Sequence, residues 1–214
     1  MLVKNRMSHP VITVEPDLPI MDALNLMKSH NIRRTPVVDK QGKLIGIISD
    51  KDLLNAGPSD ATSLSVWEIN YLVGKIKVKQ VMTRNVLTVK GETPIEEAAR
   101  IMVDNKVGGL PVMEGDTIVG VITESDLFKI LLELMGARET AVRLTALIPD
   151  VLGELEKLTH AVAQAGGSFI SFGQFNGDDD ENRVVTFKVS GLNEAQVKEL
   201  IAPLVQEIVD IRTI

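Results

Sequence analysis

An internal repeat in the first two thirds of the chain limits the possible fold more than any other feature of the sequence. An offset of 75 residues takes Met7 onto Met82, and after one deletion the match ends with Leu53 on Leu127. Fourteen positions are identical between the two copies. Self-similarity at a fixed offset means that one supersecondary unit occurs twice, so the fold must hold two equivalent units.

Each copy predicts a strand, a helix, two further strands and a closing helix. The first helix is indicated by apolar residues at helical spacing over 20–27 and again over 95–102. The two later strands are apolar runs joined by a tight turn, and the closing helix begins at Asp50 or Glu124. The connection between the copies, roughly 55–77, predicts one more helix.

Each copy ends in the pattern Gly-apolar-apolar-Ser/Thr-x-x-Asp, at 46–52 and again at 120–126. In this pattern and its spacing the repeat resembles the CBS domain, two copies of which pack as a pair, the Bateman module. The resemblance implies tandem β-α-β-β-α domains of the α+β or α/β class. We place the first CBS domain at 1–55, a linker with its helix at 56–77 and the second CBS domain at 78–135.

The polar residues of this pattern have two interpretations. Ser49 with Asp52, and Thr123 with Asp126, have the spacing of a capping box, which satisfies the first backbone N–H groups of a helix without any ligand. A helix start with a hydroxyl also suits a phosphate, and a carboxylate one turn later can accept the hydroxyls of a ribose. Capping and ligand binding do not exclude each other.

The CBS resemblance implies that the clefts bind an adenosine compound such as AMP, ADP, ATP or S-adenosylmethionine. It implies that Asp52 and Asp126 hold ribose, that the segments before the repeated prolines form the second wall of each cleft, and that threonines of the first strands line the same clefts. The nucleotide-binding residues implied in this way are Thr13, Ile32, Arg33, Arg34, Thr35, Pro36, Ser49, Lys51, Asp52, Thr88, Val107, Gly108, Gly109, Leu110, Pro111, Thr123, Ser125 and Asp126.

The two copies differ in charge around these positions. Copy one carries Arg33, Arg34 and Lys51, which can neutralise a phosphate. The matched residues of copy two are the uncharged Gly108, Gly109 and Ser125. If both clefts bind, we expect copy one to prefer the more phosphorylated ligand. The alternative is that the arginine pair forms a solvated face.

The pattern changes after residue 137, and we expect a third domain at 138–214. A strand, a helix, two strands, a helix and a strand follow in order, which predicts a ferredoxin-like βαββαβ sandwich. The turn at 148–155 is similar to the Pro-Asp-x-Pro-Gly-x-Leu turn of ACT domains, with Leu152 in place of the second proline. This resemblance implies an amino-acid ligand site at Pro149, Asp150 and Gly153. Over its full length the chain resembles the bacterial acetoin utilization protein (AcuB) family.

Composition argues against several classes of protein. Seven aromatic residues and a net charge of −6 offer few base-stacking platforms and no basic face for nucleic acid. The chain has no cysteine, its three histidines lack metal-ligand spacing, and no apolar run reaches the length of a membrane span. Phosphate-loop and nucleophile motifs are missing. We therefore expect a cytoplasmic protein that is not an enzyme and has no metal, catalytic cofactor, nucleic acid or membrane as partner.

The sequence thus predicts a regulatory protein, in which a CBS pair binds an adenine nucleotide and an ACT-like domain senses an amino acid or mediates association. We expect a homodimer, because both domain types commonly dimerise in their families, and a regulated enzyme or other protein as partner. The full-length resemblance implies a role in acetoin utilization. Two alternatives stay open: a scaffolding dimerisation module with empty CBS clefts, and a small enzyme with an unrecognised site.

Overall fold

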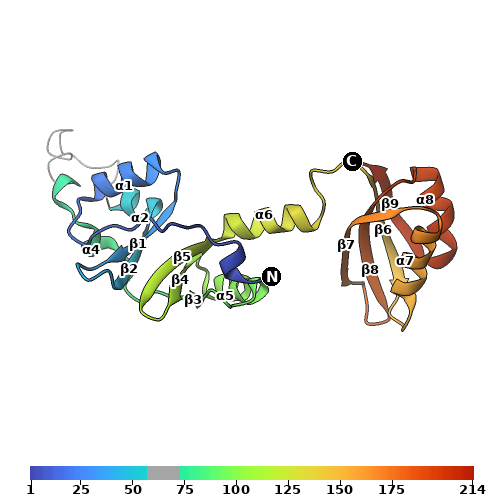
Figure 1. Cartoon of the computed structure of the whole chain (residues 1–214), viewed down its shortest axis with the longest axis horizontal. Helices are drawn as coiled ribbons and strands as arrows, with labels where there is room; N and C mark the ends of the chain where they lie inside the picture. The colour runs from blue at the N-terminus through green and yellow to red at the C-terminus, as the bar shows by residue number, and fades with distance from the viewer. Residues whose placement is uncertain (57–72) are drawn as a thin grey trace. The chain divides into compact units, whose positions relative to one another are not determined.

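The computed structural model describes residues 1–56 and 73–214 and divides into two compact units, residues 1–127 and 128–214 (Figure 1). The first unit holds both copies of the repeat except for most of the closing helix of copy two, which belongs with the C-terminal part to the second unit. The helix expected between the copies falls largely outside the described residues. No helix among the described residues is long and apolar enough to cross a membrane.

Copy one has the predicted helix, strand, strand and helix order. The elements are α1 (Ile20–Ser29), β1 (Arg34–Val38), β2 (Leu44–Ser49) and α2 (Asp50–Asn55). The apolar spacing that predicts α1 also forms its buried face, which includes Ile20 and Met27. The expected first strand is reduced to a single bridge between Val14 and Val37. The apolar run over 11–14 therefore predicted a longer strand than the structure has. The segment pairs with β1 at a single residue only.

Copy two repeats this order with a slightly larger sheet. Its elements are β3 (Val89–Lys90), α5 (Ile95–Asn105), β4 (Gly109–Glu114), β5 (Thr117–Thr123) and α6 (Glu124–Leu134). The strand order is β3-β4-β5, with β3 parallel to β4 and β4 antiparallel to β5. Gly42 and Gly115 have positive φ in the matched hairpin turns of the two copies, as the predicted tight turns require.

The segment that leads into each copy packs on the other copy. The short helix η1 (Val3–Asn5) is tied to copy two, because the Val3 amide donates to the Thr93 carbonyl and Ser8 pairs with Val121. The short helix α4 (Val78–Val81) lies in the hydrophobic core of copy one. The two copies therefore exchange their leading segments. Each packed domain consists of the body of one copy and the leading segment of the other.

Two methionines make the same exchange visible at single residues. A Cβ on Gly46 would lie 2.5 Å from the Sδ of Met82, and a Cβ on Gly120 would meet the Sδ of Met7 in the same way. Each methionine lies in the leading segment of one copy and each glycine lies in the signature strand of the other. The glycines are needed because a side chain would displace the methionine that fills this space.

The C-terminal unit has the predicted βαββαβ order. Its elements are β6 (Val142–Pro149), α7 (Glu154–Gln164), β7 (Ser168–Asn176), β8 (Asn182–Ser190), α8 (Glu194–Ile201), η2 (Ala202–Leu204) and β9 (Glu207–Thr213). The antiparallel sheet has the order β7-β8-β6-β9, and α7 and α8 cover one face (Figure 1). Alternate residues of β6 and β8 join both helices in one core. This arrangement is the ferredoxin-like topology that the sequence predicts.

A buried lysine fixes the first residues of this unit. Lys188 of β8 is 3% exposed, and its Nζ donates to the carbonyls of Gly136 and Glu139 at 2.9 and 2.8 Å. Gly136 has a φ of +56°, which ends the turn after α6. A buried ammonium group is tolerated here because backbone carbonyls accept its hydrogen bonds.

Candidate functional site

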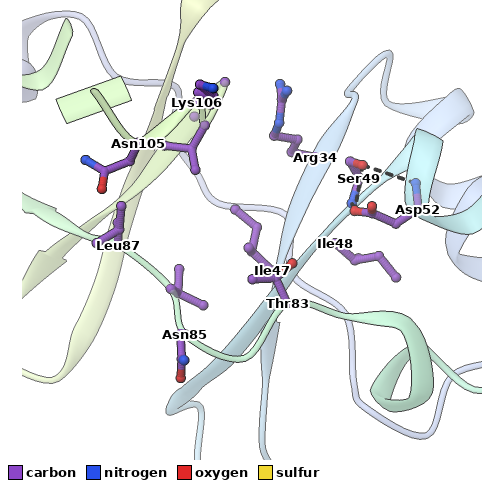
Figure 2. A pocket seen from close by; sticks show the side chains of 14 residues that line it. Arg34, Ile47, Ile48, Ser49, Asp52, Thr83, Asn85, Leu87, Asn105 and Lys106 are labelled. Carbon is purple, nitrogen blue, oxygen red and sulfur yellow. Dashed lines mark hydrogen bonds between the residues drawn. The ribbon is translucent and has the colours of Figure 1, made fainter. Parts of the chain in front are cut away.

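A cavity of about 390 Å³ opens where the two copies meet (Figure 2). Copy one contributes the end of β2 and the start of α2. Copy two contributes the segment before β3 and the turn between α5 and β4. The lining residues are Arg34, Ile47, Ile48, Ser49, Asp52, Thr83, Asn85, Val86, Leu87, Asn105, Lys106, Val107, Gly108 and Gly109.

A capping box lies on the copy-one side of the cavity. The backbone N–H and the hydroxyl of Ser49 donate to Asp52 Oδ2 at 2.8 and 2.6 Å, and the amide of Asp52 donates to Ser49 Oγ at 3.2 Å. The predicted capping role is therefore confirmed. No hydrogen bond joins Asp52 Oδ1 to another residue in the described part of the chain. This oxygen can still accept a hydrogen bond from a hydroxyl group of a ligand.

The opposite wall comes from copy two. The CBS resemblance implied that the segments 32–36 and 107–111 form the second walls of the two clefts. In the structure, Lys106 to Gly109 line the cavity with Ser49 and Asp52. The two walls of this cavity therefore come from different copies, and the start of α2 faces the turn that follows α5. Arg34 is the one member of 32–36 that also lines the cavity.

The two arginines of copy one point toward copy two. Arg33 Nη2 donates to the Oγ of Ser125, at the start of α6, over 2.6 Å. Arg34 passes over Gly108, and its Nη2 would collide with a Cβ at that position. Arg33 therefore contacts the signature of the other copy, whereas Arg34 lines the cavity.

The second signature repeats two of the three internal hydrogen bonds of the first. The amide and the hydroxyl of Thr123 donate to Asp126 Oδ2 at 3.1 and 2.7 Å. Asp126 is only 6% exposed, whereas Asp52 is partly exposed. A ligand therefore reaches the first carboxylate more easily than the second.

The remaining predicted residues are spread over other surroundings. Thr35, Pro36, Leu110 and Pro111 are buried, and the Thr35 hydroxyl donates to the Ile12 carbonyl at 2.5 Å. These four side chains stabilise the strands and do not line the cavity.

Four other predicted residues also lie outside the cavity lining. Thr88 lines a different cavity, together with Lys43 and Glu97. Thr13 and Ile32 are partly buried, and Lys51 is exposed. Neither Thr13 nor Thr88 therefore lines the cavity beside Asp52.

Several lining residues were missed by sequence reasoning. Asn85 lies before β3, Asn105 is the last residue of α5 and Lys106 follows it, all outside the recognised signature. Lys106 has a φ of +53°, and the repeat-matched Asn31 has a φ of +52°. Both copies therefore end their first helix with a residue in the left-handed conformation. Asn31 and Lys106 are different residue types, so the sequence repeat did not point to this shared backbone feature.

The predicted ligand residues of the C-terminal unit lie together at the end of β6. Asp150 is paired with Arg183 through Oδ2 and Nη2 at 2.7 Å. Gly153 has a φ of +91°, with open space where a Cβ would be. Leu152, which replaces the proline of the motif, is fully exposed. Among the described residues, no group of three or more His, Cys, Asp or Glu could hold a metal ion.

These features define a tandem-repeat module whose two copies enclose a polar cleft beside a Ser/Thr-x-x-Asp box. The CBS domain model matches residues 3–59 and 78–133, which together make up more than half of the chain. The chain therefore belongs to the CBS domain family. The model leaves the C-terminal unit from residue 134 onward unmatched.

Relatives and solved structures agree with this assignment. A CBS domain-containing protein of Dictyostelium discoideum is 35% identical over 135 residues, which cover 63% of this chain and 93% of the relative. The CBS domain pair of protein MJ0100, solved with 5′-methylthioadenosine and S-adenosylmethionine, is 29% identical with a TM-score of 0.52, and the match covers 65% of this chain and 98% of that one. A "putative acetoin utilization protein (AcuB)" from Vibrio cholerae is 32% identical with a TM-score of 0.53, covering 64% and 95%.

Proposed function

We propose that this protein is a regulatory, non-enzymatic protein whose CBS pair binds an adenosine compound. One observation carries the proposal: the cavity between the copies joins the Ser49 and Asp52 box to the backbone of Lys106 to Gly109. A carboxylate with one unbonded oxygen suits ribose hydroxyls, and the nearby cations suit a phosphate. The similar pair of MJ0100, which was solved with two adenosine compounds, supports this ligand class.

The regulatory step follows from the shared cleft. A ligand that touches both copies binds better to one arrangement of the two, so it shifts the population toward that arrangement. The C-terminal unit then presents itself differently to a second copy or to a regulated enzyme. The exposed apolar residues of α6, which include Phe128, Leu131 and Leu134, support a homodimer.

We further propose that the C-terminal unit is an ACT-like domain. Its topology and the left-handed Gly153 support this assignment, and Pro149, Asp150 and Gly153 are the candidate ligand residues. The Asp150 carboxylate is already paired with Arg183, so an amino-acid ligand would have to use the backbone of the turn. A role in acetoin utilization and a cytoplasmic location remain parts of the proposal, the former supported by the likeness to the Vibrio cholerae protein.

The test is thermal unfolding with AMP, ADP, ATP, S-adenosylmethionine and NAD in turn. A ligand at 100 times its dissociation constant adds about 2.7 kcal/mol, which is roughly 5–10 °C for a unit of this size. Asp52→Ala should abolish a shift that arises in the cavity. Asp126→Ala tests the second cleft in the same way, so the variant that abolishes the shift assigns the cleft that binds. If no compound raises the Tm, the adenosine proposal fails and the scaffolding alternative takes its place.

A further inference from the structure

The charged ends of Arg34 and Glu124 both lie close to Gly108. A Cβ built on Gly108 would lie 2.7 Å from Glu124 Oε2 and closer still to Arg34 Nη2. Arg34 belongs to β1 of copy one, whereas Glu124 is the first residue of α6 in copy two. No hydrogen bond or ion pair within 4.0 Å joins either side chain to another residue in the part of the chain that the structure describes. The two charged groups are therefore near each other without forming a direct ion pair.

Arg34 is also part of the cavity wall. It is paired with Ser49 across the β1–β2 ladder, and it lies between Ser49 and Lys106 in Figure 2. Its guanidinium can therefore turn toward a ligand in the cavity or toward Glu124. Gly108 makes both positions possible, because any side chain there would occupy the space that the guanidinium uses.

We propose that Arg34 determines the charge specificity of this cavity and that Glu124 is its internal counter-ion. The inference rests on the proposed adenosine site and deepens it. In the empty protein Glu124 partly neutralises Arg34. An anionic group on the ligand replaces Glu124 as the partner of Arg34, so the cavity favours a nucleotide with a phosphate over the neutral nucleoside. Glu124 weakens this preference, because the phosphate must compete with a carboxylate that is already in place.

Calorimetric titration with AMP and with adenosine tests the proposal. We expect Arg34→Gln to weaken AMP binding about tenfold and to change adenosine binding less than twofold. Glu124→Gln should tighten AMP binding by about threefold to tenfold and leave adenosine unchanged. In the Arg34→Gln, Glu124→Gln double variant, the gain from Glu124→Gln should disappear, because the carboxylate acts through Arg34.

Glu96→Gln is the matched control. Glu96 is an acidic residue in the first turn of α5, as Glu124 is in the first turn of α6, and the cavity uses the other end of α5. It lies nine residues before the lining residue Asn105, about 14 Å along the helix, beyond the range at which exposed charges interact strongly. Glu96→Gln should leave both affinities unchanged.

Three results would overturn the inference. The first is an unchanged ratio of AMP to adenosine affinity in Arg34→Gln, and the second is an equal gain from Glu124→Gln with and without Arg34. The third is a gain of the same size from Glu96→Gln, which would show a general effect of net charge. These outcomes leave the adenosine site standing. If the unchanged protein binds neither AMP nor adenosine, both the site and its charge specificity are rejected.

Discussion

Copy one brings two arginines to the junction, at Arg33 and Arg34, where copy two has Gly108 and Gly109. Read along the sequence, this difference gives one cationic cleft and one neutral cleft. In the structure the side chains cross over, because Arg33 binds Ser125 and Arg34 fills the space that Gly108 leaves. Long side chains in one copy fit small residues in the other. The difference between the copies is therefore a complementary contact, and the charge of a cleft cannot be assigned from its own copy.

The largest expected changes in stability come from substitutions in the buried core, and they test whether the two copies unfold together. Ile48 and Ile122 are matched, fully buried strand residues of the two copies. Ile48→Ala and Ile122→Ala should each lower the free energy of unfolding by about 2–5 kcal/mol. Because the copies share their leading segments, both variants should shift one common transition of the first unit in denaturant unfolding. Two separate transitions, each moved by only one variant, would show that the copies are independent.

A second pair of variants tests the exchange of leading segments directly. Val3 and Val78 are matched in the repeat and are both fully buried. Val3→Ala and Val78→Ala should each cost about 1.5–3 kcal/mol. Hydrogen exchange should show that Val3→Ala loosens α5 of copy two more than α1, and that Val78→Ala does the opposite. Loss of protection in the variant's own copy would contradict the exchange.

The order of the elements, the turns and the capping boxes could be predicted because they depend on local signals. Apolar spacing forms the buried face of α1, and Ser49 caps α2 as its spacing to Asp52 indicates. The cleft was predicted only in part, because its walls come from both copies. Lys106 and Asn85 have no local pattern that marks them, and only the packing of one copy on the other brings them beside Asp52.

The caps should have a smaller effect than the core. Ser49→Ala and Thr123→Ala each remove a helix cap, and each should cost about 1 kcal/mol of stability. We expect similar costs in chemical denaturation, because both hydroxyls donate to the aspartate of their own box at 2.6 and 2.7 Å. A loss of several kcal/mol in only one of the two would show that this hydroxyl has a further structural partner.

The smallest effect concerns two matched ion pairs that tie the leading segments in place. Lys79 Nζ lies 2.7 Å from Asp17 Oδ1, and Lys4 Nζ lies 3.5 Å from Glu92 Oε1. The hydrogen bond and the charge of Lys79 lower the pKa of Asp17 below its ordinary value. A carboxylate with a lowered pKa stabilises the folded state above its ordinary pKa, and this stabilisation is lost as the pH falls through the lowered value.

Asp17→Asn should therefore lower the Tm slightly at pH 7, and the difference from the unchanged protein should vanish in strong acid. Glu92→Gln should have less effect at every pH, because the distance in its ion pair is longer, 3.5 Å against 2.7 Å. Melting curves recorded from pH 7 down to pH 2 would measure both. A difference for Asp17→Asn that persists at pH 2 would mean that its cause is not the charge.

The exchanged leading segments also bear on how such a chain could have arisen. A single ancestral copy with this geometry would have carried a leading segment that fits another molecule's signature strand, as Met82 fits Gly46 and Met7 fits Gly120. Such an ancestor would have been stable only as a symmetric pair of molecules. Gene duplication with fusion would then have joined the pair in one chain and allowed its halves to diverge. Arginine could appear on one side and glycine on the other only after the two halves no longer had identical sequences.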